Sequence, residues 1–135
     1  NHITADRTAQ TCGCYGGALY LRLSGVLHNV TFTENTIESP FPSDGGAIAL
    51  PEQDFSLSNV TIRANGMASR AGRVGLGAGG GMYIYLHTVD VSQVVLEDNF
   101  ADYGGGVLYW RLPGDLAESA ADGMFLSNNT ASVAG

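Results

Sequence analysis

The chain has 135 residues, a formal net charge of −7 and no lysine, and 19 of its residues are glycine. This length corresponds to one domain, so we predict a single unit over residues 1–135. The acidic balance disfavours nucleic acid and anionic membranes as partners, and no apolar run reaches the roughly 18 residues of a membrane span.

The first segment of the chain, residues 1–15, contains both cysteines. Cys12 and Cys14 are separated by one glycine, and a disulfide between them would close a small, strained ring. Pairing with another segment, free thiols and metal binding stay open as alternatives. The histidines, at positions 2, 28 and 87, are scattered, whereas a structural zinc site has four ligands. We expect a disulfide of some kind in an extracellular setting, with no metal and no cofactor.

A pair of glycines followed by an alternating apolar strand comes next and recurs along the chain. The first copy is Gly16-Gly17 with residues 18–23. We place the later pairs at 45–46, 79–80 and 105–106, so the spacings are 29, 34 and 26 residues, and Ala134-Gly135 is similar to the start of a fifth copy. Period two predicts strands with one buried face. The glycines predict corners where a Cβ would clash or where φ is positive.

A second motif places an apolar residue three positions before an asparagine. The four pairs are Phe32 and Asn35, Ile62 and Asn65, Leu96 and Asn99, and Leu126 and Asn129. The asparagines are 30, 34 and 30 residues apart. We expect them to form another corner, in left-handed conformation, with their amides stacked and hydrogen bonded along one axis.

Two independent motifs with one period predict an all-β, right-handed parallel β-helix, a solenoid of about four coils of roughly 30 residues. The glycine pairs would break helices, and no two-residue hairpin turn joins consecutive strands. Unequal coils predict loops at Gly66 to Ala78 and Pro113 to Asp122. The expected inward columns are Leu19, Ile48, Met82 and Leu108; Leu21, Leu50, Ile84 and Trp110; Val30, Val60, Val94 and Met124; and Phe32, Ile62, Leu96 and Leu126.

The combination of Gly45-Gly46-Ala47-Ile48 with Phe32-Thr33-Glu34-Asn35 resembles the repeats of the polymorphic outer membrane proteins of chlamydiae. The resemblance covers nearly the whole chain, although the other copies are looser. It implies an extracellular right-handed β-helix at the cell surface. Members of that family are adhesins and autotransporter passengers, so the resemblance implies a surface role rather than a particular reaction.

Three acceptor sequons for N-glycosylation begin at Asn29, Asn59 and Asn128. By alternation, Asn29 and Asn59 point outward and lie on one column, as an attached glycan requires. The alternative is that the sequence Asn-x-Thr recurs by chance in a repeat that is rich in these residues.

A strip of aromatic and arginine side chains is expected on the outer face beside the glycine pairs. One outward column is Tyr20, Ala49, Tyr83 and Tyr109, and its neighbour is Arg22, Pro51, Tyr85 and Arg111. Tyrosine faces stack on sugar rings and arginine pairs with carboxylates, so the strip is a candidate contact surface for glycans or proteins. The alternatives are ordinary cross-strand pairs and a surface covered by a neighbouring chain.

Catalytic groups are weakly represented. Glu97, Asp98 and Asp102 form one acidic group, and Asp115, Glu118 and Asp122 form another. Polysaccharide cleavage needs matched carboxylates, or bound Ca²⁺ beside a basic residue, and neither group recurs with an outward arginine. We therefore expect no enzyme but an extracellular structural or adhesive module that displays loops and glycans. The alternative is a carbohydrate-binding or polysaccharide-degrading β-helix.

The two termini are similar to cuts through a continuing array. We see no polar cap at either one, and a β-helix without caps exposes unpaired strand edges. The expected partners are flanking coils or further copies of the chain, which head-to-tail contacts would join into a filament. Glycans and proteins of the host or cell surface are further candidate partners.

Overall fold

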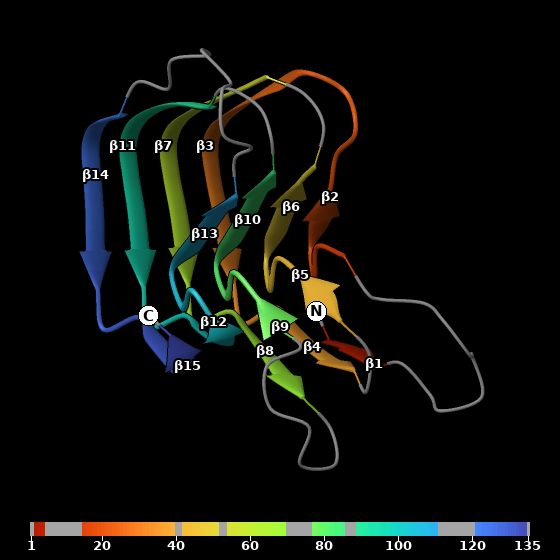
Figure 1. Ribbon diagram of the computed structural model, residues 1–135. Helices are drawn as coiled ribbons and strands as arrows, with labels where there is room; N and C mark the ends of the chain where they lie inside the picture. Colours follow the sequence, from red (N-terminus) through yellow and green to blue (C-terminus); the bar gives the residue numbers. More distant parts are fainter. Residues whose placement is uncertain are drawn as a thin grey trace.

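The computed structural model describes residues 2–4, 15–39, 42–51, 54–69, 77–85, 89–110 and 121–134, and this part of the chain is all-β. Its strands form three sheets in which every pair is parallel (Figure 1). Sheet I consists of β3 (Gly25–Thr33), β7 (Phe55–Arg63), β11 (Val89–Glu97) and β14 (Ala121–Ser127). Sheet II consists of β2 (Leu19–Tyr20), β6 (Ile48–Leu50), β10 (Met82–Tyr85) and β13 (Val107–Trp110). Sheet III consists of β1 (His2–Thr4), β4 (Thr36–Ser39), β8 (Gly66–Ser69), β12 (Phe100–Tyr103) and β15 (Thr130–Ala134), with β5 (Ser43–Asp44) and β9 (Gly77–Ala78).

The chain winds from sheet II to sheet I to sheet III and then returns to sheet II one strand further along. Each strand therefore pairs with the equivalent strand of the next coil, as the order β3, β7, β11, β14 shows. This is a parallel β-helix, so the predicted fold is confirmed. Figure 1 shows the strands of sheets I and II side by side along a common axis.

The register confirms the predicted columns of sheet I, and their members are buried or partly buried except Leu126 in the end strand β14, which is 56% exposed. The register pairs Val30 with Val60, and Val60 in turn pairs with Val94. The next column runs from Phe32 through Ile62 and Leu96 to Leu126. Because Ile62 and Leu96 are fully buried, each contributes on the order of 2 kcal/mol to folding.

The columns of sheet II are correct for three coils and wrong by one residue in the fourth. Met82 pairs with Val107, not Leu108, and Ile84 pairs with Tyr109, not Trp110. The cause is the run of three glycines at 104–106. Gly104 has a φ of 58°, which matches the left-handed first glycine of the other corners at 16, 45 and 79. The fourth pair is therefore Gly104-Gly105, one position earlier than predicted.

The glycine corners lie directly against the asparagine corners across the interior. A Cβ on Gly46 would lie 2.0 Å from the Gly80 carbonyl oxygen and 2.9 Å from the Gly66 nitrogen, and Gly66 follows Asn65. This contact separates two cores. The larger core lies between sheets I and II, and the smaller one, beneath sheet III, contains Ile37, Met67 and Ala101.

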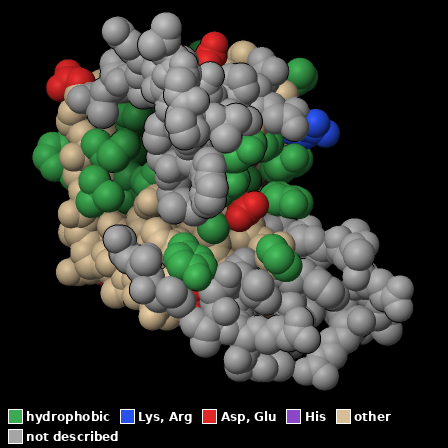
Figure 2. All heavy atoms as spheres, viewed as in Figure 1, with side chains coloured by type: hydrophobic (Ala, Val, Ile, Leu, Met, Phe, Trp, Pro, Cys, Tyr) green, Lys and Arg blue, Asp and Glu red, His purple; other side chains and the backbone are tan. Residues whose placement is uncertain are grey.

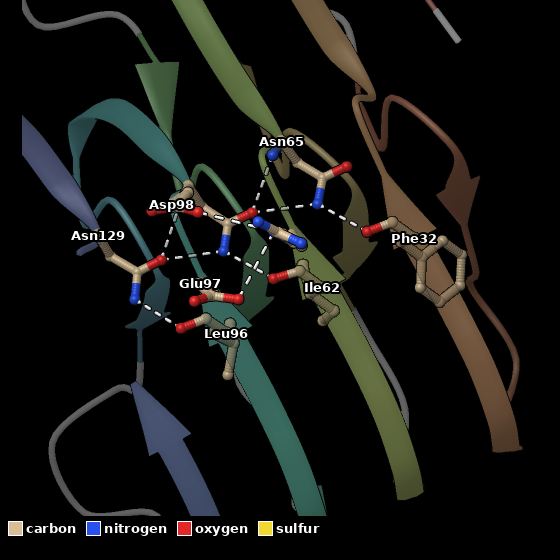
Figure 3. A network of polar contacts seen from close by, with 9 residues as sticks. Phe32, Ile62, Asn65, Leu96, Glu97, Asp98 and Asn129 are labelled. Atoms are coloured by element: carbon tan, nitrogen blue, oxygen red, sulfur yellow. Dashed lines mark hydrogen bonds and ion pairs between the residues drawn. The ribbon is translucent and has the colours of Figure 1, made fainter. Parts of the chain in front are cut away.

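The asparagines form a continuous ladder along the axis (Figure 3). The side-chain nitrogen of Asn65 donates to the Asn99 side-chain oxygen and to the Phe32 carbonyl, both at 3.0 Å. Asn99 repeats this arrangement with Asn129 and with the Ile62 carbonyl, both at 2.9 Å. The predicted stacking of the amides is confirmed.

The expected left-handed conformation of the asparagines is wrong. The positive φ belongs to the preceding residue in each coil, at Glu34, Ala64, Asp98 and Asn128, with values between 51° and 55°. These residues turn the chain, and the asparagine side chain is thereby directed inward, where it bonds to the next coil.

The unequal coil lengths arise within sheet III. Strands β8 and β9 are separated by residues 70–76, whereas β12 alone pairs with both of them: Phe100 opposes Gly66 and Tyr103 opposes Ala78. The predicted loop Gly66 to Ala78 is thus too long, since both its ends are strands. The predicted loop Pro113 to Asp122 overlaps the start of β14, and its remainder lies outside the described residues.

Candidate functional site

Two outward columns flank the glycine corner. The residue before the first glycine of each coil belongs to one column, because Tyr15 pairs with Asp44, Asp44 with Ala78, and Ala78 with Tyr103. The second column begins five residues later in each coil, where Tyr20 pairs with Ala49 and Ala49 with Tyr83. Ala49 itself is fully covered, whereas Tyr20 is exposed. We call Tyr15, Tyr20, Asp44, Tyr83 and Tyr85 the tyrosine corner.

The side chains of the tyrosine corner converge. The ring centroids of Tyr15 and Tyr20 are 5.5 Å apart, with ring planes tilted by 35°. Those of Tyr83 and Tyr85 are 6.4 Å apart and nearly parallel, at 7°. Tyr15 and Tyr20 remain 48% and 41% exposed. Figure 2 shows hydrophobic side chains gathered on this side of the molecule, with few charged groups among them.

Asp44 is the carboxylate of this corner. Burial raises the pKa of Asp44 to about 6. Burial, followed by the nearby groups of Asp44, Tyr85 and Tyr15, raises the pKa of Tyr83 to about 12. Within the described part of the chain, the Asp44 side chain has no hydrogen bond and no ion pair. The corner therefore contains a half-buried acid among aromatic rings without a counter-charge.

The pKa of Asp44 predicts a pH dependence of stability. Because the folded-state pKa lies above the model value of 3.8, the folded chain holds this proton more tightly than the unfolded chain. The contribution of Asp44 to stability therefore decreases as the pH rises from about 4 to about 6. Asp44→Asn removes this contribution, so the variant should gain stability relative to the parent across that range. Urea unfolding at several pH values measures the difference.

The control for this experiment is Asp90→Asn, which removes an exposed carboxylate from β11. It should leave the pH profile of the parent unchanged. A profile of Asp44→Asn parallel to that of the parent between about pH 4 and pH 6 would contradict the assigned role of burial.

The predicted surface strip is only partly assembled. Tyr20, Tyr83 and Tyr85 lie in the tyrosine corner, and Arg22 is exposed just beyond β2. Tyr109 does not share the column of Tyr83, because the register pairs Tyr83 with Leu108. Arg111 lies outside the described residues.

Tyr15 and Asp44 are missing from the predicted strip. The signal that identifies them is their position immediately before a glycine pair, five residues ahead of Tyr20 and Ala49 respectively.

The sequon asparagines are on the outside. Asn29 and Asn59 are exposed, and the Asn59 side-chain nitrogen donates to the Asn29 side-chain oxygen. Both have positive φ, 54° and 52°, and His28 beside Asn29 also faces solvent. Asn128 is exposed at the corner before Asn129. The predicted outward column of Asn29 and Asn59 is therefore present. The Asn59 side-chain nitrogen, to which a glycan would be attached, donates a hydrogen bond to Asn29.

The predicted acidic group of Glu97, Asp98 and Asp102 is not assembled. Glu97 and Asp98 lie 3.5 and 3.6 Å from the Arg63 guanidinium on the outer surface. The Asp102 carboxylate faces inward, where it accepts from the Gly77 backbone nitrogen at 3.1 Å and from the Ser132 hydroxyl at 3.0 Å.

The remaining candidates provide no further cluster in the described part of the chain. Asp122 is exposed on β14, whereas Asp115, Glu118, Cys12 and Cys14 lie outside the described residues. The described residues contain no group of three or more His, Cys, Asp or Glu side chains that could hold a metal ion.

Stacked coils with asparagine and glycine corners define a repeat protein of the parallel β-helix class. Residues 29–51 match the family model of the Chlamydia polymorphic membrane protein repeat, so the resemblance inferred from the two motifs is confirmed for this segment. The segment runs from Asn29 within β3 to Pro51, the residue after β6, and contains one asparagine corner and one glycine corner. The match is consistent with a module of a surface protein.

The other comparisons give no relative. No curated protein and no solved structure matches the chain. In the described residues no helix is long and apolar enough to cross a membrane.

Proposed function

We propose that this chain is an extracellular structural and adhesive module, a stiff β-helical rod that presents outer surfaces to a partner and does not catalyse a reaction. The observation that carries the proposal is the tyrosine corner on an otherwise regular stack of coils. The rings of Tyr15 and Tyr20 are exposed although the scaffold beneath them is packed, and exposed aromatic clusters mark contact surfaces.

The rod itself is held by two kinds of ladder. Backbone bonds join every strand of sheet I to its neighbours, and the buried asparagine amides join the corners. Each coil is thus fixed to the next at several points around its circumference, as in other solenoids. A rigid support reduces the entropy lost when its surface binds a partner.

Bead adhesion tests the proposed role. Beads coated with the folded chain should bind to cultured cells more than beads coated with albumin, and soluble chain should compete for the same sites. Binding no greater than that of the albumin beads would contradict the adhesive role.

Carbohydrate binding or cleavage is the second candidate function, and the exposed faces of Tyr15 and Tyr20 favour it because such faces stack on sugar rings. A glycan array and an assay for products released from acidic polysaccharides test it. Cleavage that is lost in Arg22→Ala would support an enzyme and contradict our first proposal.

A further inference from the structure

We infer that the two ends of the β-helix bind each other in separate copies of this chain, and that β1 must leave its place on β4 for the two ends to meet. The partner is therefore a second copy of the chain. The inference goes beyond the proposed adhesive function and does not depend on it. It follows from the exposure of the end strands, from the asparagine ladder and from the strand order of sheet III.

The two end strands of sheet I expose columns that the middle strands bury. On β7 the columns contain Val60 and Ile62, which are fully buried. On β3 the same columns are only half-buried, at Val30 and Phe32, and on β14 Leu126 is exposed. Figure 1 shows β14 and β3 at opposite ends of the sheet, and no described strand pairs with the outer edge of either. An unpaired edge beside apolar side chains is a template for a further strand.

The asparagine ladder ends at Asn129 with unused donors (Figure 3). Within the ladder, the Asn99 side-chain oxygen accepts from the backbone nitrogen and from the side-chain nitrogen of Asn65, each at 3.0 Å. In the described part of the chain, the Asn129 side-chain nitrogen donates to the Leu96 carbonyl alone, and its backbone nitrogen donates to no group. An open cavity of about 320 Å³, lined by Gly104 to Gly106 and by Asn129, lies at this place.

The first coil of a second copy has the side chains that fit this end. If β3 of that copy lies beside β14 in the register of the other strands, Val30 meets Met124 and Phe32 meets Leu126. Asn35 is then brought to the cavity, where its side-chain oxygen would accept from the two donors of Asn129. Sheet II continues in the same way, because β2 and β13 are its end strands.

The outer face of sheet I adds a pair of opposite charges. The register runs from His28 through Ser58 and Ser92 to Asp122. Docking therefore places the exposed His28 imidazole of one copy beside the exposed Asp122 carboxylate of the other. A protonated imidazole attracts this carboxylate, so the contact is complementary in charge as well as in shape.

Sheet III imposes the condition on β1. Strand β4 pairs with β8 on one edge and with β1 on the other. In the docked pair, the place that β1 occupies beside β4 belongs to β15 of the other copy, and both strands cannot hold it. We expect β1 to leave, because it pairs through three residues, whereas β15 is fixed by the bond from Ser132 to Asp102, 3.0 Å long. Since every docked copy offers a new end, the pairs grow into a filament.

Sedimentation velocity of the full chain at increasing concentration tests the association, and the sedimentation coefficient should increase. Leu126→Arg should weaken the association at least about 10-fold, because it places a charge in the apolar contact. Phe125→Arg is the matched control. Phe125 is the neighbouring residue and is also exposed, but it belongs to an outward column with Val95, so this variant should associate like the parent. Both side chains are exposed in the single chain, so both variants should fold.

Hydrogen exchange followed by NMR tests the departure of β1 in the unaltered chain. In the associated form the backbone amides of β1 should exchange faster than in the single chain, and those of β3 should exchange more slowly. Ile3→Pro provides a second test, since proline removes a backbone donor from β1 and is poorly tolerated in a paired strand. This variant should associate at a concentration at least about 10-fold lower than the parent.

Three results would each overturn the inference. The first is a single sedimenting species at every concentration for both the parent and Ile3→Pro. The second is equal association of Leu126→Arg and Phe125→Arg. The third is protection of the β1 amides that is unchanged or greater in the associated form. Association of Ile3→Pro alone would support the inference, because it would show that β1 blocks the contact.

Discussion

Gly46→Ala is expected to prevent the chain from folding, with a loss of more than about 4 kcal/mol from the free energy of unfolding. The new Cβ would lie 2.0 Å from the Gly80 carbonyl oxygen and 2.9 Å from the nitrogen of Gly66. All of these atoms belong to the main chain, so no side-chain rotation relieves the overlap. Separation of the coils would break the bond from the Gly46 nitrogen to the Gly79 carbonyl, now 2.9 Å.

The loss is comparable to the whole stability of a typical domain, so the expected readouts are a random-coil circular dichroism spectrum and low soluble yield. Gly25→Ala is the matched control. Its Cβ would lie 3.5 Å from the Phe55 ring, an ordinary contact, and its φ is not positive. This control should retain the parental stability or gain up to about 1 kcal/mol, because alanine restricts the unfolded chain. Unfolding curves of Gly46→Ala that overlay those of Gly25→Ala would contradict the close contact of the two corners.

The contact between glycine and asparagine corners explains why the two sequence motifs recur together. Either motif alone predicts a corner, but neither states that the two corners touch. Their contact brings Gly46 next to Gly66, 20 positions later. Tyr15 and Tyr20 lie on either side of the glycine pair in the first coil, and their ring centroids are 5.5 Å apart.

This geometry also explains what the sequence could and could not predict. Sheet I was predictable because Val30, Val60 and Val94 repeat with an unambiguous spacing. The third and fourth coils each contain three consecutive glycines, which offer two possible pairs. The prediction uses the first pair in the third coil and the second pair in the fourth, and only the positive φ at Gly79 and Gly104 shows that the first pair is right in both.

The position of Asp44 beside the tyrosines was not predicted, because the alternation of residues along a strand gives no information about contacts across a corner. The left-handed conformation of the residue before each asparagine was not predicted for another reason. Glu34, Ala64, Asp98 and Asn128 share a φ near 53° but have no side-chain property in common, so the conformation is imposed by the fold.

The second large effect is expected for Asn65→Asp, which should lower the stability at pH 7 by about 3 to 5 kcal/mol. The change keeps the size of the side chain, so no cavity forms. It replaces the donor nitrogen by oxygen opposite two acceptors, the Phe32 carbonyl and the Asn99 side-chain oxygen, both 3.0 Å away. It also places a charge in a fully buried site. Loss of two buried donors costs about 1 to 3 kcal/mol each, and burial of the charge adds to this.

Asn59→Asp is the matched control, since it makes the same chemical change in the same coil, at an exposed position within β7. Asn59 is exposed and its amide has a single side-chain partner, Asn29, so the loss should stay below about 1 kcal/mol. At about pH 4 the new carboxyl group of Asn65→Asp can take up a proton and donate one hydrogen bond, and part of the lost stability should return. Urea unfolding at both pH values measures this recovery. If the two variants lose equal stability at pH 7, the asparagine ladder does not hold the coils together, and the backbone bonds between strands must carry the axial cohesion alone.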